Sequence, residues 1–429
     1  MIKTLKPAAG LSGKPKIPGD KSISHRALIF GALAEGRTEV IDPLESGDVH
    51  STARCLADLG VKFTRESTQQ SKKIYVEGIG AKGFTPPQNI LDCGNSGTTI
   101  RLLMGVLAGC GVTATLTGDS SLVGRPMKRV AEPLRLMGAK FELTKEDYAP
   151  LTVRATQLHA IDYHLKIASA QTKTAIMLAA LFAEGTTIIR GEIHSRDHTE
   201  RMLKHFGVKV DVSPTQIAIQ GGQKLKAAHV TVPGDPSTAA FWMAAASLVP
   251  GAKIEMENIS LNPTRIGFIT ALQRMGANIT IELTSETPEP VGRITIVSGA
   301  LKGVKISKEE VPTLIDELPL LAVLASQAHG VTEVEGAEEL RVKETDRIEA
   351  MAVNLRAMGV VVEVRKDGFR ITGPQPLKGA AVQSFHDHRI AMGFSIASLV
   401  AKGETTIHGA DCVGISYPEF FNTLKELTQ

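Results

Sequence analysis

Hydrophobic and polar positions repeat a two-helix pattern about every 70 residues along the chain. An apolar helical run without a polar face comes first, followed by a glycine and a short stretch rich in β-branched residues. The glycines of this marker are Gly36, Gly111, Gly185, Gly251, Gly330 and Gly403. Because these helices are apolar all round, we expect each to be buried on every side.

A second, amphipathic helix follows in the same units. It ends in LADLG, LRLMG, LKHFG, LQRMG and LRAMG, whose glycines are Gly60, Gly138, Gly207, Gly276 and Gly359. Glycine after a periodic run is typical of a helix C-terminus, and the β-branched residues beyond it predict a strand. The pattern therefore predicts six copies of one α/β unit, each with two helices and several strands.

The two halves of the chain also align with each other. Ile17-Pro18-Gly19-Asp20 lies over Val232-Pro233-Gly234-Asp235, where the shared residues are explained by a turn and a helix N-cap. We therefore predict two similar domains of three units each, with crossings near Pro18 and Pro233. Residues 1–18 and 233–429 form one domain, and residues 19–232 form the other.

The alignment also shows which basic residues of the first half have no basic counterpart in the second half. Lys21, His25 and Arg26 lie over Pro236, Ala240 and Phe241. The repeated fold thus does not require these three basic residues, which favours a role for them in binding a ligand.

Overall charge excludes several classes of partner. The chain has 48 Lys and Arg against 45 Asp and Glu, so no global field favours nucleic acid or an anionic membrane. Its longest apolar run, near residues 239–246, is far below the roughly 20 residues that span a bilayer, and the N-terminus lacks a signal-peptide pattern. The four cysteines have no zinc spacing and are expected to be reduced. We expect a cytoplasmic protein without nucleic-acid or membrane partners.

Basic residues nevertheless gather at the starts of the apolar helices, where the helix dipole repels them. They are Lys21, Arg26, Arg101, Lys173 and Arg389. Capping explains the Ser, Thr, Asp and Asn residues found there, but not these cations. If the helices of a domain point their N-termini the same way, the cations predict a site for a multiply charged phosphate or carboxylate.

Two other sites are disfavoured by spacing. A nucleotide P-loop would need contiguous Gly-Lys-Ser, whereas Asp20 separates Gly19 from Lys21. The histidines at 194–198 and 386–388 have neither an HExxH arrangement nor a cysteine partner, so no metal site is predicted.

Residues 340–347, Leu-Arg-Val-Lys-Glu-Thr-Asp-Arg, form a further charged run. On a helix, Lys343 and Arg347 share one face and Glu344 lies beside them. An exposed, salt-bridged helix start is the alternative to a catalytic role for this run.

Six motifs together resemble those of the 5-enolpyruvylshikimate-3-phosphate (EPSP) synthase family. They are PGDKSISHR, GNSGTTIR, GDSSLVGRPM, SAQTK, LRVKETDRI and HDHRIAMGFSIAS, and the resemblance covers essentially the whole chain. It implies an α/β fold of two similar domains, each with three βαβαββ repeats around buried parallel helices (an inside-out α/β barrel), and an active site in the cleft between them.

The resemblance implies a reaction as well. The enolpyruvyl group of phosphoenolpyruvate is transferred to the 5-hydroxyl of shikimate 3-phosphate by addition and elimination, and phosphate is released. No metal or organic cofactor is implied, and members usually act as monomers.

Roles for individual residues follow from the same resemblance. Asp316 is expected to accept the 5-hydroxyl proton with help from Lys343, while Glu344 and Lys21 serve the enol methylene as acid and base. The expected ligands of shikimate 3-phosphate are Lys21, Ser22, Arg26, Ser169, Ala170, Gln171, Arg196, Asp316 and Lys343. Those of phosphoenolpyruvate are Lys21, Gly97, Arg125, Gln171, Arg347, His388 and Arg389.

The chain departs from many members at a few positions. Ala170 replaces a serine, Ile415 replaces a lysine, and Arg125 stands four residues beyond the loop arginine of some members. Ala170 and Arg196 match a second branch of the family that includes glyphosate-tolerant members, whereas Gly97 is typical of sensitive ones.

Two alternative functions remain open at this point. UDP-N-acetylglucosamine enolpyruvyl transferase shares the fold but has a reactive cysteine on a loop where this chain, at residues 118–126, has none. A non-catalytic anion-binding protein would explain the cations but not Asp316 and Glu344 beside them.

Overall fold

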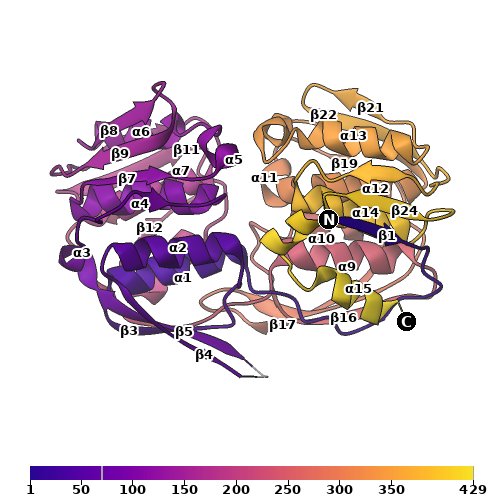
Figure 1. Cartoon of the computed structure of the whole chain (residues 1–429), viewed down its shortest axis with the longest axis horizontal. Helices are drawn as coiled ribbons and strands as arrows, with labels where there is room; N and C mark the ends of the chain where they lie inside the picture. Colours follow the sequence, from indigo (N-terminus) through magenta and orange to yellow (C-terminus); the bar gives the residue numbers. More distant parts are fainter. Residues whose placement is uncertain (69–70, 429) are drawn as a thin grey trace. The chain divides into compact units, whose positions relative to one another are not determined.

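The computed structural model describes residues 1–68 and 71–428, which form two compact units. The continuous unit is Gly19–Val232, and the split unit combines Met1–Pro18 with Pro233–Gln429. Figure 1 shows the continuous unit in indigo to magenta, and most of the split unit in orange and yellow.

The continuous unit contains three small sheets. Their strand orders are β14-β3-β5-β4 (with β15 also pairing with β3), β6-β7-β9-β8 and β10-β11-β13-β12. The strands are β3 (Ala34–Ile41), β4 (Lys62–Ser67), β5 (Lys72–Ile79), β6 (Leu91–Asp92), β7 (Ala114–Thr117), β8 (Lys140–Thr144), β9 (Tyr148–Arg154), β10 (Asp162–Leu165), β11 (Thr186–Gly191), β12 (Asp211–Val212), β13 (Gln216–Gln220), β14 (Leu225–Lys226) and β15 (His229–Thr231). Because β14 and β15 pair in parallel with β3, the last residues of this unit complete its first sheet.

The split unit repeats the arrangement. Its sheets have the orders β17-β18-β16-β2, β19-β20-β22-β21 and β1-β24-β23. The strands are β1 (Ile2–Leu5), β2 (Ser12–Gly13), β16 (Lys253–Ser260), β17 (Asn278–Ser285), β18 (Val291–Val297), β19 (Lys305–Ile306), β20 (Gly330–Val334), β21 (Glu363–Arg365), β22 (Gly368–Gly373), β23 (Ala381–Gln383) and β24 (Thr405–His408). The N-terminal segment supplies β1, antiparallel to β24, and β2, parallel to β16, so it belongs to two of these sheets.

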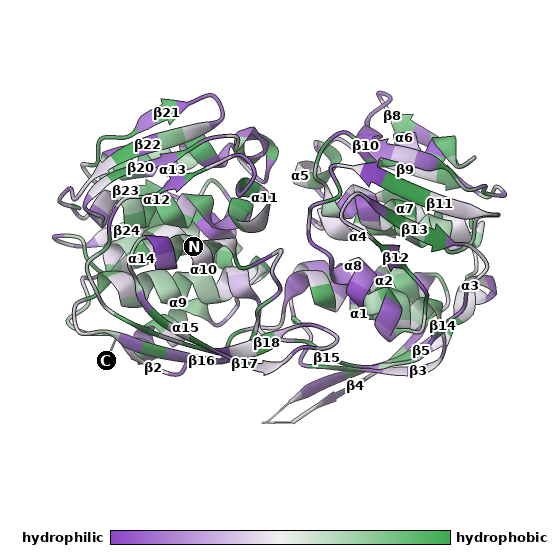
Figure 2. Ribbon diagram, turned by 180° about the vertical axis from the view of Figure 1, so that it is seen from behind, coloured by the Kyte–Doolittle hydropathy of each residue, from purple (hydrophilic) through white to green (hydrophobic). Residues whose placement is uncertain are grey.

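Each of the six repeats of the sequence pattern contributes one buried helix. They are α1 (Lys21–Leu33), α4 (Gly97–Cys110), α7 (Ala170–Ala180), α9 (Pro236–Leu248), α12 (Leu318–Gln327) and α14 (His388–Ser398). The apolar colouring of α9 and α12 is visible in Figure 2. Helices α4 and α7 pack so closely that a Cβ on Gly105 would lie 2.4 Å from the Ala175 carbonyl oxygen. The predicted α/β fold with apolar helices at its centre is confirmed.

Amphipathic helices cover these inner ones. They are α2 (Gly47–Asp58), α6 (Lys128–Leu136), α8 (His198–His205), α10 (Gly267–Arg274), α13 (Arg347–Ala357) and α15 (Phe420–Leu427). The shorter helices are α3 (Gly80–Gly83), α5 (Ser120–Val123), α11 (Val311–Leu314) and the 3-10 helices Ile315–Glu317, Glu338–Val342 and Ala410–Ile415.

The expected helix through Lys343, Glu344 and Arg347 is wrong in one respect. Helix α13 begins only at Arg347, and its N-cap Asp346 accepts a hydrogen bond from the backbone N–H of Glu349 at 3.0 Å. Lys343 and Glu344 therefore lie in the preceding segment, where an Asp cap competes successfully with helix extension. Their side chains are placed by tertiary contacts instead of by helical spacing.

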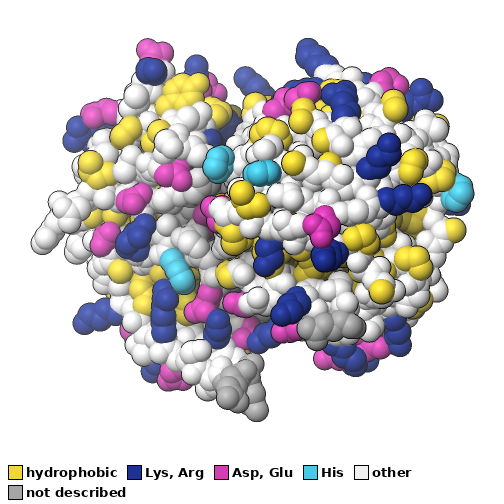
Figure 3. All heavy atoms as spheres, turned by 45° about the vertical axis from the view of Figure 1, so that its right-hand side comes forward, with side chains coloured by type: hydrophobic (Ala, Val, Ile, Leu, Met, Phe, Trp, Pro, Cys, Tyr) yellow, Lys and Arg dark blue, Asp and Glu magenta, His cyan; other side chains and the backbone are white. Residues whose placement is uncertain are grey.

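The surface carries both signs of charge. On the face in Figure 3, Lys and Arg side chains are interspersed with Asp and Glu. Among the described residues, no helix combines the length and the apolar character needed to cross a membrane.

Candidate active site

The first turns of α1, α4 and α7 meet in the continuous unit. Arg101 Nη1 donates to Gln171 Oε1 at 2.7 Å, and Gln171 Nε2 donates to Thr98 Oγ1 at 3.1 Å. Arg26 Nη2 donates to Thr174 Oγ1 at 2.8 Å, which joins α1 to α7. Three positive helix ends therefore lie together, as an anion site requires.

Acidic and hydroxyl side chains cap these helices. Asp20 Oδ1 accepts from Ile23 N at 2.9 Å, and Ser96 Oγ accepts from Thr99 N at 3.1 Å. Ser169 Oγ accepts from the backbone N–H of Thr172 at 3.3 Å, so this predicted ligand is also the N-cap of α7. Ala170 and Gln171 occupy the first turn that it caps.

The predicted ligands on α1 are held by the protein itself. Lys21 forms an ion pair with Asp48 of α2. Arg26 is buried and donates from Nε to Thr199 Oγ1 at 2.8 Å and from Nη1 to the Ser22 carbonyl at 3.0 Å. Ser22 is half-buried beside them. Both cations are thus fixed in direction by neighbouring side chains.

His25 differs from the cations on either side of it. Its ring is fully buried, and Nδ1 lies 2.7 Å from Thr52 Oγ1, which in turn lies 2.6 Å from Thr99 Oγ1. Burial, and then the charge of Lys21, lowers the pKa of His25 to about 3. His25 is therefore neutral and is a packing residue instead of one of the anion-binding cations.

Two arginines lie beside Gly97. A Cβ on this glycine would be 3.1 Å from Arg101 Nη1 and 3.5 Å from Arg125 Nη1. Arg125 Nη2 donates to Asn95 Oδ1 at 2.9 Å and to Ser121 Oγ at 3.0 Å. Arg101 has no role in the family-based prediction, although its position at the start of an apolar helix identified it as unusual.

Lys173 was counted among the cations that predict an anionic ligand, and the structure contradicts this for Lys173. Its Nζ lies 2.6 Å from Glu200 Oε1, and both side chains are almost completely buried. The anion that offsets this cation is therefore a carboxylate of α8 and not a ligand. No local pattern predicts this pairing, because the two residues belong to different helices. Arg196 lies half-buried in the loop before α8.

In the split unit, one arginine joins three carboxylates. Arg347 donates from Nε to Asp387 at 2.7 Å, from Nη1 to Asp316 at 3.0 Å and from Nη2 to Glu344 at 2.7 Å. Burial by itself would lower the pKa of Arg347, but Asp387, Glu344 and Asp316 raise it above its ordinary value. Arg347 is therefore charged and fully engaged by acidic partners.

Asp316 is the point where the basic residues of this unit converge. Besides Arg347, its carboxylate has Arg389 Nη2 at 3.8 Å and Lys343 Nζ at 4.0 Å. These two contacts are looser than those of Arg347 because neither has hydrogen-bond geometry. Arg389 can therefore turn to another anion at a smaller cost than Arg347.

The inner helices of the split unit also bring their first turns together. Asp387 caps α14 by accepting from Arg389 N at 2.8 Å, and His388 follows it, buried, in the first turn. Arg389 Nη1 lies 3.4 Å from Glu317 Oε1, before α12. Burial raises the pKa of Glu317, and the charge of Arg389 opposes that rise. Asp387 and Glu317 were not predicted as site residues; only their acidic character at a helix start pointed to them.

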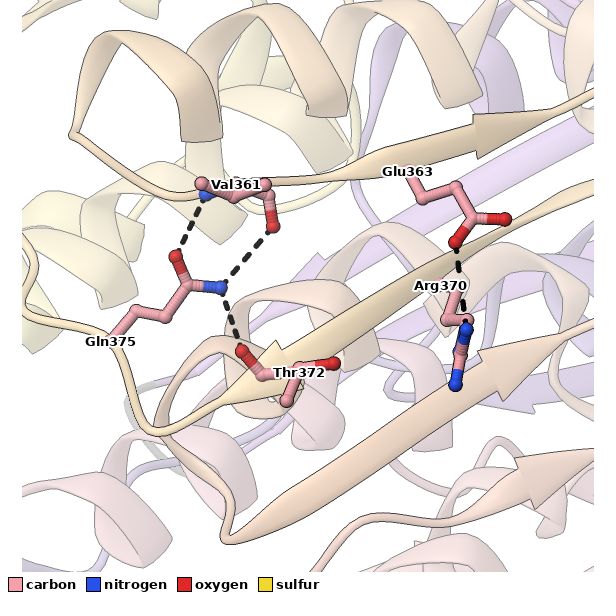
Figure 4. A pocket seen from close by; sticks show the side chains of 5 residues that line it. All are labelled: Val361, Glu363, Arg370, Thr372 and Gln375. Carbon is pink, nitrogen blue, oxygen red and sulfur yellow. Dashed lines mark hydrogen bonds and ion pairs between the residues drawn. The ribbon is translucent and has the colours of Figure 1, made fainter.

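A shallow pocket of about 330 Å³ lies elsewhere in the split unit. It is lined by Val361, Glu363, Arg370, Thr372 and Gln375 (Figure 4). Gln375 accepts from Val361 N at 2.8 Å and donates to Thr372 O at 2.7 Å, while Arg370 pairs with Glu363 at 3.8 Å. These polar groups satisfy one another, and none of the predicted substrate ligands lines the pocket.

Known proteins resemble the chain over nearly its whole length. Residues 5–424 match the family described as EPSP synthase (3-phosphoshikimate 1-carboxyvinyltransferase). A 3-phosphoshikimate 1-carboxyvinyltransferase of Bacillus thuringiensis (strain Al Hakam) is 46% identical over 423 residues, 98% of each chain. One of Bacillus cereus (strain ATCC 10987 / NRS 248) is 46% identical over 430 residues, covering 100% of this chain and 99% of the relative. A solved EPSP synthase from Acinetobacter baumannii matches with a TM-score of 0.88 and 41% identity, covering 99% of this chain and 98% of that one.

Proposed function

Because the chain belongs to the EPSP synthase family, we propose that its two clusters of basic and acidic residues act on one pair of substrates. The chain is a 3-phosphoshikimate 1-carboxyvinyltransferase of the shikimate pathway, on the way to chorismate and the aromatic amino acids. It transfers the enolpyruvyl group of phosphoenolpyruvate to the 5-hydroxyl of shikimate 3-phosphate and releases phosphate. What is proposed here is which residues perform this transfer.

Shikimate 3-phosphate is assigned to the first turns of α1 and α7 in the continuous unit. Ser22, Arg26, Ser169, Ala170 and Gln171 lie there, and Arg196 lies in the loop that precedes α8. Support comes from the meeting of three positive helix ends, which suits a phosphate dianion. Lys21, Asp316 and Lys343 complete the proposed set.

Phosphoenolpyruvate carries a phosphate and a carboxylate, which demand several cations. We assign it to Lys21, Gly97, Arg125 and Gln171 from the continuous unit, and to Arg347, His388 and Arg389 from the split unit. Arg389 is the best supported of the second group because its contacts with Asp316 and Glu317 are 3.4 Å or longer.

The chemistry needs one proton acceptor and one reversible proton donor. Asp316 takes the proton of the 5-hydroxyl as the hydroxyl oxygen of shikimate 3-phosphate bonds to C2 of phosphoenolpyruvate. C3 of phosphoenolpyruvate gains a proton. Loss of a proton from C3 then restores the double bond as the C2–O bond to phosphate breaks. Glu344 and Lys21 are proposed to serve C3. The observation that carries this assignment is the Asp316 carboxylate, with three cations within 4.0 Å of it.

Phosphate release from phosphoenolpyruvate tests the assignment. Lys21→Ala and Glu344→Ala should each lower turnover by about 10²–10⁴-fold, as expected for a general acid or base, without unfolding the chain. Turnover close to wild type in either variant would remove that residue from the mechanism. UDP-N-acetylglucosamine, offered as the alternative acceptor, should give no release.

We also propose that the protein acts as a monomer in the cytoplasm and needs no cofactor. Sedimentation at two protein concentrations should give the mass of a single 45.7 kDa chain at both. A mass that rises with concentration would contradict the monomer.

A further inference from the structure

Lys173 and Glu200 form a buried ion pair that has no part in the proposed reaction. Lys173 lies in the second turn of α7, and Glu200 lies in the first turn of α8. Their side chains are 1% and 6% exposed, and Nζ lies 2.6 Å from Glu200 Oε1. Burying two charges costs free energy unless their hydrogen bonds are satisfied, so this pair is a candidate for a specific role in the protein.

The other hydrogen bonds of the Lys173 ammonium group, to backbone carbonyls, indicate its role. Lys173 Nζ donates to the carbonyl of Ile193 at 3.1 Å and to that of Ser195 at 3.3 Å. A lysine has three N–H donors, and these contacts use all three. Lys173 therefore fixes two backbone positions of the loop between β11 and α8, besides pairing with Glu200.

The loop held in this way leads directly into Arg196. The carbonyl of Ser195 belongs to the peptide bond that links it to Arg196, so the ammonium group holds the backbone on which this arginine stands. On its other side, α7 carries Ser169, Ala170 and Gln171 in its cap and first turn. One buried ammonium thus joins the helix and the loop that carry four of the proposed ligands of shikimate 3-phosphate.

We propose that Lys173 and Glu200 are positioning residues that hold Arg196 against the first turn of α7, and so set the affinity for the acceptor substrate. The proposal rests on the binding role of Arg196 given above. Glu200 orients the ammonium group through Oε1, and the ammonium group then places the Ile193–Ser195 backbone. Neither residue is expected to contact the reacting atoms.

The test replaces both charges together. Lys173→Met/Glu200→Gln preserves the approximate size of the side chains and leaves no unpaired buried charge, so we expect it to fold. KM for shikimate 3-phosphate should rise on the order of tenfold to a hundredfold, the scale of small misplacements at a binding site, while KM for phosphoenolpyruvate stays within about twofold. Arg154→Met/Glu142→Gln, which removes both charges of an exposed Arg–Glu pair on β8 and β9, should leave both values unchanged.

Two further readouts separate positioning from general loosening. Amide hydrogen exchange at Ser195–Asp197, measured without substrate, should become faster in the double variant but not in the control. In an Arg196→Ala background, the double variant should raise KM for shikimate 3-phosphate no further. Equal rises for both substrates, unchanged exchange, or an effect that adds fully to Arg196→Ala would each overturn the proposal.

The exchange measurement does not depend on the proposed function, whereas turnover of the wild-type chain tests that function directly. If the double variant does not fold, Glu200→Gln replaces it, since this variant weakens the pair but keeps an acceptor for Lys173. A selective rise in KM together with faster loop exchange would then support the proposal, and no change in either would overturn it.

Discussion

Replacing Arg347 with alanine should reduce the stability of the split unit as well as activity. The guanidinium group is buried and donates to Asp387, Asp316 and Glu344 at 2.7–3.0 Å. Asp387 is completely buried, so the variant would leave a carboxylate with no cation in the interior. The loss should also weaken the start of α14, because the same carboxylate caps that helix.

The magnitude follows from the burial of the partners. Removing one member of a buried ion pair costs about 3–5 kcal/mol, most of it the penalty on the partner left behind. With an m value of ~3 kcal/mol/M for urea, the unfolding midpoint should fall by ~1–2 M. Arg389→Ala is the matched control. Its contacts with Asp316 and Glu317 are longer, at 3.4–3.8 Å, and its side chain is 15% exposed, so the loss should be clearly smaller than that of Arg347→Ala.

Tryptophan fluorescence measures this change in the correct unit. Trp242, the single tryptophan of the chain, is buried in α9 and stacks on Phe420 with ring centroids 5.2 Å apart. Its emission therefore follows unfolding of the split unit. Arg347→Ala/Asp387→Asn should recover part of the lost stability because the completely buried carboxylate is then absent, while activity stays low. Equal small shifts for Arg347→Ala and Arg389→Ala would refute the reasoning.

Two further predictions concern the pKa of His25 and the close packing of α4 against α7. Because the folded state lowers the pKa of His25 from 6.5 to about 3, protonation favours the unfolded chain. The stability due to neutral His25 is complete above pH 6.5 and falls by about 1.4 kcal/mol per unit as the pH drops toward 3. Calorimetry of wild type and His25→Asn should show a smaller loss in the variant; equal losses would contradict the assignment. Gly105→Ala places a Cβ 2.4 Å from the Ala175 carbonyl and should cost about 1–3 kcal/mol, whereas Gly393→Ala in α14 meets no atom within 4 Å and should be neutral or stabilising by thermal circular dichroism. Equal melting temperatures for these two variants would contradict the close packing of α4 and α7.

Much of the fold could be predicted from local patterns because each of its units carries the same signals. An apolar helix, a glycine, a strand and an amphipathic helix recur with period and order intact, and hydrophobic burial alone distinguishes inner from outer helices. The N-terminal segment shows the limit of this argument. The alignment of the two halves assigned residues 1–18 to the same domain as residues 233–429, but no local pattern identified β24 and β16 as the partners of the short strands β1 and β2.

The charged residues show a similar division. Their types and their places at helix starts indicated an anion site, and the family motifs assigned roles to Asp316, Glu344 and Lys21. Helical spacing misplaced Lys343 and Glu344, since the cap at Asp346 starts α13 later. A local signal for that start exists, since Asp346 followed three residues later by Glu349 is typical of a helix N-terminus, but only the contacts of Arg347 decided where the Glu344 side chain lies.

The sequence by itself determined the repeated α/β architecture, the burial of six apolar helices and the choice of residues at their first turns. Only the tertiary structure decided which anion each cation meets: Glu200 for Lys173, Asp48 for Lys21 and three carboxylates for Arg347. The physical reason is that burial follows from the local pattern of apolar residues, whereas an ion pair depends on the distance between groups that the chain brings together from separate helices and loops.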